Sequence, residues 1–251
     1  MKTQHISWLV AAMAAVALPA WAQDEPSADA EAVAEPAPSL LIIWPEDAVL
    51  GDPDAPVTIF EFSSLTCSHC AAFHVDILPE VKAELIESGM ANLVVRHFPL
   101  DQLAMNAALV AECVPQGQFH SFIDVLYRTQ ESWVGSQNPM QAVLQTAMLA
   151  GVPEAGLSTC MQDQAVMNSV LAVRLRAQTE LAIQSTPTFF VGGMMIRGAQ
   201  PFHVFAEAVE VAAAVVAPPV ETPESDAQDE PEAQAGPETA EPETETETTT
   251  E

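Results

Sequence analysis

Basic residues are scarce in this chain of 251 residues, which has 7 Lys and Arg against 35 Asp and Glu. Such an excess of negative charge repels nucleic acids and anionic lipid surfaces, so we exclude both as partners. The sequence also lacks a phosphate-binding glycine loop, a dinucleotide fingerprint and a Ser-His-Asp arrangement with motif support. Nothing in it therefore points to nucleotide chemistry or to serine hydrolysis.

Long apolar runs are also lacking, apart from Ile6 to Leu18 near the start of the chain. Lys2 precedes this run and Ala20-Trp21-Ala22 follows it, which is typical of a cleaved secretory signal. A membrane anchor is the alternative, but the run is short of the roughly 20 residues that a span needs, and no basic cluster follows. No Cys stands directly after the cleavage site, which argues against a lipid anchor. We expect residues 1–22 to be a signal peptide and the mature chain to lie in the periplasm.

Two segments have no apolar periodicity and are rich in Ala, Pro and acidic residues. Residues 23–39 are predicted to be a disordered linker, and residues 217–251, with 12 acidic and no aromatic residues, a disordered tail. The tail is interpreted as a solvating extension, with a partner-binding arm as the alternative. One folded unit, residues 40–216, remains between them.

The folded unit alternates between strand and helix patterns, which predicts an α/β fold. Strands are expected at 40–44, 57–62 and 92–98, with a hairpin over 188–196 turning at Gly192-Gly193. A helix follows residue 70, is kinked at Pro79 and ends at Gly89. Residues 101–183 show only helical patterns, at 101–113, 119–130, 139–150, 153 onward and 164–183, so we expect an inserted all-helical subdomain. A last helix is predicted over 202–214.

Cysteine is rare, and two of the four cysteines form the motif Cys67-Ser68-His69-Cys70 at a strand-to-helix junction. The N-terminus of a helix stabilises a thiolate, so a C-x-x-C pair at this position indicates redox chemistry. We assign Cys67 as the exposed reactive sulfur and Cys70 as the buried resolving thiol. A buried structural pair and half of a zinc site are the alternatives.

Three other residues are candidates for the same site. His69, inside the motif, is expected to stabilise the thiolate, although it could be a plain surface histidine. Glu61 interrupts an apolar strand, so it is either a buried acid that relays a proton to Cys70 or an edge residue in contact with water. Pro187, after Thr186, marks a strand start, with a cis peptide bond as one option.

The other two cysteines, Cys113 and Cys160, both fall in the helical region. In an exported chain we favour a structural disulfide between them, with free thiols or a second redox pair as alternatives. A four-cysteine zinc site has poor spacing because only one C-x-x-C is present. The remaining histidines have no metal-ligand spacing either, so neither a metal nor a cofactor is expected.

Taken together, the motifs resemble those of the DsbA-type thiol–disulfide oxidoreductases of the thioredoxin superfamily. The resemblance rests on Phe60-Glu61-Phe62 before the Cys pair, on Arg96-His97-Phe98-Pro99-Leu100, and on the run from Thr186 to Gly193. It covers about residues 50 to 212. It implies a thioredoxin fold with an inserted helical subdomain.

The resemblance also implies roles for individual residues. Cys67 would be the nucleophilic sulfur, Cys70 its partner and Glu61 a buried acid. Pro187 would be cis and face the disulfide, while Thr186 would offer backbone hydrogen bonds to an extended substrate. Here Ser68-His69 stands where the best-known oxidases carry Pro-His, and Thr before the cis-Pro looks like the isomerase branch.

The expected function is therefore an exported oxidase that introduces disulfides into folding proteins and is reoxidised by a membrane quinone-linked partner. A reductase or isomerase with the same site is the alternative, and a non-catalytic metal- or peptide-binding module is a third hypothesis. Isomerases of this kind are usually oligomers. Residues 23–39 do not resemble a dimerisation element, so we expect a monomer.

Overall fold

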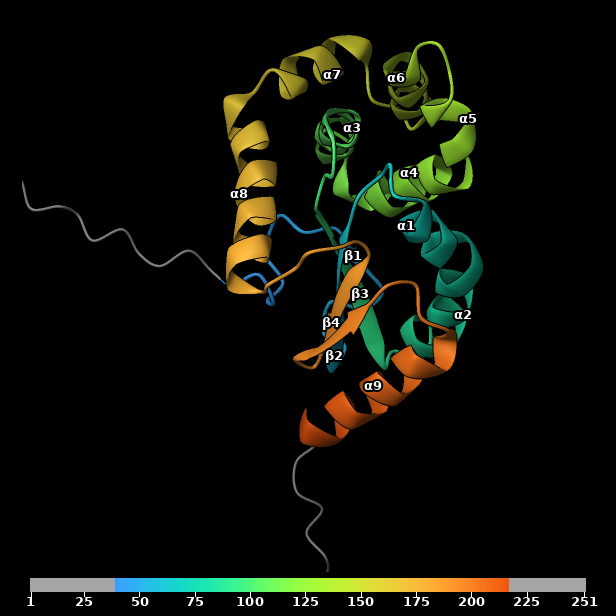
Figure 1. Ribbon diagram of the computed structural model, residues 1–251, viewed down its shortest axis with the longest axis vertical. Helices are drawn as coiled ribbons and strands as arrows, with labels where there is room; N and C mark the ends of the chain where they lie inside the picture. Colours follow the sequence, from blue (N-terminus) through green and yellow to red (C-terminus); the bar gives the residue numbers. More distant parts are fainter. Residues whose placement is uncertain (1–38, 217–251) are drawn as a thin grey trace, which may run out of the picture. The chain divides into compact units, whose positions relative to one another are not determined.

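The computed structural model describes residues 39–216 (Figure 1). The described residues do not include the predicted signal peptide at 1–22 or the acidic tail at 217–251. Of the predicted linker at 23–39, they include only residue 39. The chain divides between Ser39 and Leu40 into two units, and the description below concerns the second unit alone.

Five strands form one mixed sheet in the order β1-β3-β2-β4-β5. The strands are β1 (Val49–Leu50), β2 (Val57–Ser63), β3 (Ala91–His97), β4 (Thr188–Val191) and β5 (Met194–Arg197). β2 and β3 run parallel, whereas the other neighbouring strands are antiparallel. The predicted strands at 57–62 and 92–98 and the hairpin after residue 187 are confirmed. The chain leaves β2 at the centre of the sheet, directly before the Cys pair.

The predicted strand over residues 40–44 is wrong, because this segment forms turns. Leu40 is buried without strand pairing, at 1% exposed, and the ring of Trp44 lies under the guanidinium of Arg96, 3.5 Å from ring centroid to Cζ, whereas Ile42 is exposed. Pro45 follows at once and cannot donate to a strand ladder. Arg96 of β3 also donates to the carbonyl of Ile42 at 2.8 Å and to Asp47, so the segment is held against β3.

The helix after the Cys pair is divided into four parts: α1 (Ser68–Ala72), η1 (Phe73–Ile77), α2 (Leu78–Val81) and η2 (Lys82–Ile86). η1 and η2 are π-helical. The sequence predicts a kink at Pro79, and the structure shows π-helical turns before and after this residue. Pro79 has no N–H to donate, and just before it the N–H of Leu78 bonds to the carbonyl of Phe73, five residues back. The widened turn contains two buried side chains, Phe73 and His74.

The inserted helices all lie between β3 and β4 in the chain. They are α3 (Gln102–Glu112), α4 (Gln116–Arg128), α5 (Gln130–Val134), α6 (Pro139–Leu149), α7 (Glu154–Met161) and α8 (Gln164–Glu180). Asp101 and Asn138 cap α3 and α6 through their side chains. α5 was not predicted as a separate helix. The α/β class with an all-helical insertion is confirmed, and α9 (Phe202–Val216) closes the described part of the chain.

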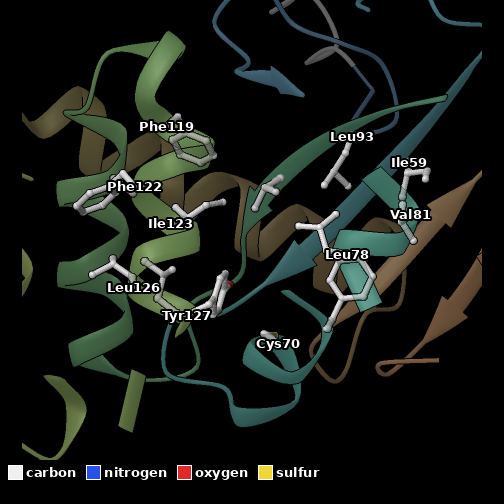
Figure 2. Close-up of a cluster of buried hydrophobic side chains, with 14 of the residues drawn as sticks. Ile59, Cys70, Leu78, Val81, Leu93, Phe119, Phe122, Ile123, Leu126 and Tyr127 are labelled. Atoms are coloured by element: carbon white, nitrogen blue, oxygen red, sulfur yellow. The ribbon is translucent and has the colours of Figure 1, made fainter. Parts of the chain in front are cut away.

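The side chains of β2 alternate between the two faces of the sheet and bury both. Ile59 belongs to the larger core cluster, with Phe73 and Phe205, whereas Phe60 and Phe62 belong to the second, with residues of α8. Figure 2 shows part of the larger cluster, in which Tyr127 of α4 reaches toward Cys70. By the same alternation Glu61 faces the larger cluster, beneath the helix that carries the Cys pair. Within residues 39–216 no helix has the length and apolar character that a membrane span requires.

Candidate active site

The Cys pair stands where the central strand passes into a helix. Cys67 is the N-cap residue of α1, with an extended backbone, and its N–H bonds to the carbonyl of Ser64 at 3.0 Å. Its own carbonyl accepts from the N–H of Ala71 at 3.1 Å. Cys70 lies in the first turn of the helix and is fully buried, whereas Cys67 is partly exposed. Both are free thiols, so the structure describes the dithiol form.

The surroundings of Cys67 favour a thiolate. A hydrogen bond from the Cys70 thiol makes the largest contribution, and together with the backbone N–H groups of Cys70 and His69 it lowers the pKa of Cys67 to about 5, although burial opposes the shift. A thiol with that pKa is mostly ionised at neutral pH, and the thiolate is the nucleophilic form. Cys67 is therefore suited to attack a disulfide and to leave from one.

Cys70 has the opposite preference. Burial is the main cause that raises its pKa well above the ordinary value, and the neighbouring Cys67 and the charge of Glu61 add to it. A negative charge on Cys70 is therefore unfavourable, and this sulfur needs a proton whenever its bond to Cys67 breaks.

The loop before β4 completes the exposed side of the site. The Thr186–Pro187 peptide bond is cis. In its thiol form Cys67 donates from Sγ to the carbonyl oxygen of Thr186 at 3.4 Å, although the two residues are 119 positions apart in the chain. The structure thus brings Thr186, which precedes cis-Pro187, to the Cys pair, an arrangement that the resemblance implies.

Glu61 is fully buried rather than at a wet strand edge. Both of its carboxylate oxygens lie 3.0 Å from Nε2 of His74. The ring of His74 is 1% exposed and stacks on Tyr127, with ring centroids 4.1 Å apart. The buried acid thus has a titratable partner, which the sequence-based interpretation overlooked. The signal was present, because Cys70, Phe73 and His74 follow the i, i+3, i+4 spacing of one helix face.

Two further placements refine the predicted site. The side chain of His69 is exposed, and His69 acts on the pKa of Cys67 through its backbone N–H. Gln130, at the start of α5, donates to the carbonyls of Leu65 at 2.8 Å and Cys67 at 3.0 Å. Gln130 thereby holds the loop that presents the reactive sulfur, and nothing in the local sequence marks it.

Cys113 and Cys160 lie away from this site, in the helical insertion. The structure joins them in a disulfide, with Cα atoms 5.9 Å apart, which links the end of α3 to α7. Among residues 39–216 there is no group of three or more His, Cys, Asp or Glu side chains placed to hold a metal ion.

Residues 44–211 match a family model described as thioredoxin. The chain belongs to the thioredoxin family. The predicted thioredoxin fold with a helical insertion is confirmed, and so is the DsbA-type resemblance. The crystal structure of alpha-DsbA1 from Wolbachia pipientis is similar with a TM-score of 0.65 and 26% identity, over 70% of this chain and 96% of that protein. BdbD from Bacillus subtilis shares the thioredoxin fold, with a TM-score of 0.59, 21% identity and 94% of its length covered, over 67% of this chain.

Among curated proteins, a relative from Rickettsia felis, provisionally named a protein-disulfide oxidoreductase, is 29% identical over 151 residues, or 59% of this chain. The match spans 54% of that relative, about half of its length. "Disulfide bond formation protein D" of Bacillus subtilis is 25% identical over 178 residues, which are 64% of this chain and 75% of that protein.

Proposed function

We propose that this chain is an exported thiol–disulfide oxidoreductase that introduces disulfide bonds into folding proteins through the Cys67–Cys70 pair. The observation that carries the proposal is the contrast between the two sulfurs. The pKa of Cys67 is lowered to about 5 and that of Cys70 is raised. A stabilised thiolate favours the dithiol over the disulfide, and a protein whose dithiol form is favoured gives its disulfide away.

The reaction takes two exchanges. A substrate thiolate attacks Sγ of Cys67 in the Cys67–Cys70 disulfide; the bond between the two protein sulfurs breaks, and Cys70 leaves with the electron pair and takes a proton. A second substrate thiolate then attacks the substrate sulfur of the mixed disulfide, and Cys67 leaves as a thiolate. The substrate loses two electrons and gains a disulfide, while the protein becomes the dithiol described here.

The remaining site residues have supporting roles in this proposal. The carbonyl of Thr186, beside cis-Pro187 and 3.4 Å from Sγ of Cys67, is placed to bind the backbone of an extended substrate next to the reactive sulfur. His69 stabilises the thiolate through its N–H, and Glu61 exchanges a proton with Cys70. The Cys113–Cys160 disulfide stabilises the helical insertion.

The proposed compartment and redox partner follow from the sequence and from the likeness to DsbA-type proteins. The predicted signal peptide places the chain in the periplasm, where disulfides persist. Each turnover leaves the dithiol, so an oxidant must restore the disulfide, and we propose a membrane quinone-linked partner for this step. We propose that the chain works as a monomer, which sedimentation of the mature protein tests.

Oxidative refolding of a reduced, unfolded disulfide protein by stoichiometric amounts of the oxidised chain tests the proposal. Wild type is expected to restore the activity of that protein, and Cys67→Ala is expected to be inert. Equal recovery with wild type and with Cys67→Ala would leave the pair without an enzymatic role and would favour the non-catalytic binding module.

A reductase or isomerase is the second candidate, because Thr186 precedes the cis-Pro as in the isomerase branch. The two directions use the same atoms in reverse order. A chain that reduces insulin readily at neutral pH but oxidises a reduced substrate poorly would be a reductase or isomerase.

A further inference from the structure

The buried Glu61–His74 pair lies beneath the Cys pair, and the proposed exchange does not yet explain His74. Nε2 of His74 is 3.0 Å from both oxygens of Glu61, while its Nδ1 is buried and has no hydrogen-bond partner among the described residues. An imidazole can release a proton at one ring nitrogen and accept one at the other. One nitrogen of this ring therefore contacts the buried acid, and the other has an unfilled hydrogen-bonding capacity.

A pocket of about 330 Å³ lies next to His74. His74 forms part of its wall, together with Leu78 and Pro79 of the same helix. The hydrogen-bonded turn is widened here, because η1 is π-helical. A ring that is 1% exposed therefore borders a volume large enough for several water molecules.

The charged groups around the ring differ on its two sides. On the inner side are Glu61, Cys70 and Tyr127, and Tyr127 has a raised pKa, chiefly because it is buried. On the pocket side are Lys82, His120 and the Asp124–Arg128 ion pair. Tyr127 donates its hydroxyl hydrogen to Oγ of Ser63 and stacks on the ring, so it holds His74 in place without competing for Glu61.

We infer that His74 is a proton relay that connects Glu61 and Cys70 to solvent through this pocket. The inference rests on the proposed function, since it supplies the proton that the leaving sulfur needs. When the Cys67–Cys70 bond breaks, Cys70 leaves with the electron pair and takes a proton from the Glu61–His74 pair. The pair regains a proton from solvent on the pocket side of the ring. In the reverse direction Cys70 returns its proton to solvent along the same route. Every proton is therefore accounted for without another reactant.

His74 acts through Glu61 and does not touch the reacting sulfurs, so the test must separate a relay from a structural role. His74→Gln keeps an N–H that can donate to Glu61 but cannot carry a proton from one side to the other. The oxidised protein is mixed with an excess of a single-cysteine peptide and quenched in acid, and the mixed disulfide on Cys67 is followed over a range of pH. His203→Gln, which removes an exposed histidine on α9, is the matched control.

The relay predicts that His74→Gln folds with near wild-type stability but forms the mixed disulfide about 100-fold more slowly, the lower range of general acid–base effects. Its pH profile should also lose one ionisation that wild type and His203→Gln both show. Imidazole added to His74→Ala should restore part of the rate, because the pocket admits it. Wild-type rates and an unchanged pH profile in His74→Gln would overturn the relay.

A measurement on wild type covers the case in which the His74 variants do not fold. Nitrogen NMR of the ring should show that the protonation or tautomer of His74 changes between the disulfide and dithiol forms. Identical ring signals in both forms across pH would also overturn the relay. Loss of exchange in wild type itself would instead contradict the proposed function, so the two failures are distinguishable.

Discussion

The sulfur of Cys67 lies 3.4 Å from the carbonyl oxygen of Thr186, a residue 119 positions later in the chain. The sheet brings these two residues into contact, because β2 and β4 are antiparallel neighbours and Phe62 pairs with Thr188. The end of β2 and the start of β4 therefore lie side by side. The loop after one strand carries the reactive sulfur, and the loop before the other carries cis-Pro187.

Replacing Cys70 should change the acidity of Cys67. The Cys70 thiol makes the largest contribution that lowers the pKa of Cys67 to about 5. Cys70→Ala removes this donor and should raise that pKa by about 1 to 2 units, whereas Cys70→Ser keeps a donor and should raise it less. Ultraviolet absorbance of the thiolate, followed against pH, measures both. Equal titration curves for the two variants would show that the hydrogen bond does not set the acidity.

Removing the side chain of Gln130 should loosen the loop that presents Cys67. Gln130→Ala removes the side-chain donor from the carbonyl of Leu65 and leaves that of Cys67 with the N–H of Ala71, in a region where Gln130 is 7% exposed. We expect a loss of about 1 to 3 kcal/mol in the free energy of unfolding, measured with urea. Gln145→Ala, at an exposed position of α6, is the control and should change little. A Gln130→Ala protein as stable as this control would contradict the assigned role.

Opening the Cys113–Cys160 disulfide should destabilise the insertion. The two cysteines are 47 positions apart, and closing a loop of that length stabilises the fold by about 4 kcal/mol on the chain-entropy model. The Cys113→Ala/Cys160→Ala double variant should lose about that much in urea unfolding. Wild-type stability in the double variant would count against a stabilising role.

Acid should weaken the fold through His97. This side chain is 4% exposed, and burial lowers its pKa from 6.5 to about 4. Between these values the unfolded chain binds a proton that the folded chain does not. The stabilising effect of a neutral His97 is therefore present above pH 6.5 and is lost as pH falls toward 4, by up to about 1.4 kcal/mol per pH unit.

His97→Gln removes this proton uptake and should flatten the decline in unfolding free energy between pH 6.5 and about 4. His203→Gln, at an exposed position, should retain the wild-type slope. The comparison uses urea unfolding at several pH values. Equal slopes for wild type and His97→Gln would show that His97 titrates normally.

Local sequence patterns predict those parts of the site whose residues are close to one another in the sequence. The Cys pair, the apolar strand before it and the Gly192-Gly193 hairpin are short-range signals, so they could be predicted. Helix spacing places His74 on the same face as Cys70. The contact of His74 with Glu61 and the bonds of Gln130 join different elements, and only the packed fold brings these residues together. The segment at 40–44 shows the same limit, because an apolar run is equally compatible with pairing in a sheet and with packing over it, as Leu40 and Trp44 do here.

The preference of Cys67 for the thiolate underlies the whole account, and equilibration of the Cys67–Cys70 pair with glutathione tests it most directly. An oxidase requires a reduction potential well above about −200 mV, because a favoured dithiol makes the disulfide oxidising. A potential near the −270 mV of thioredoxin would contradict the account and show that the pair serves reduction.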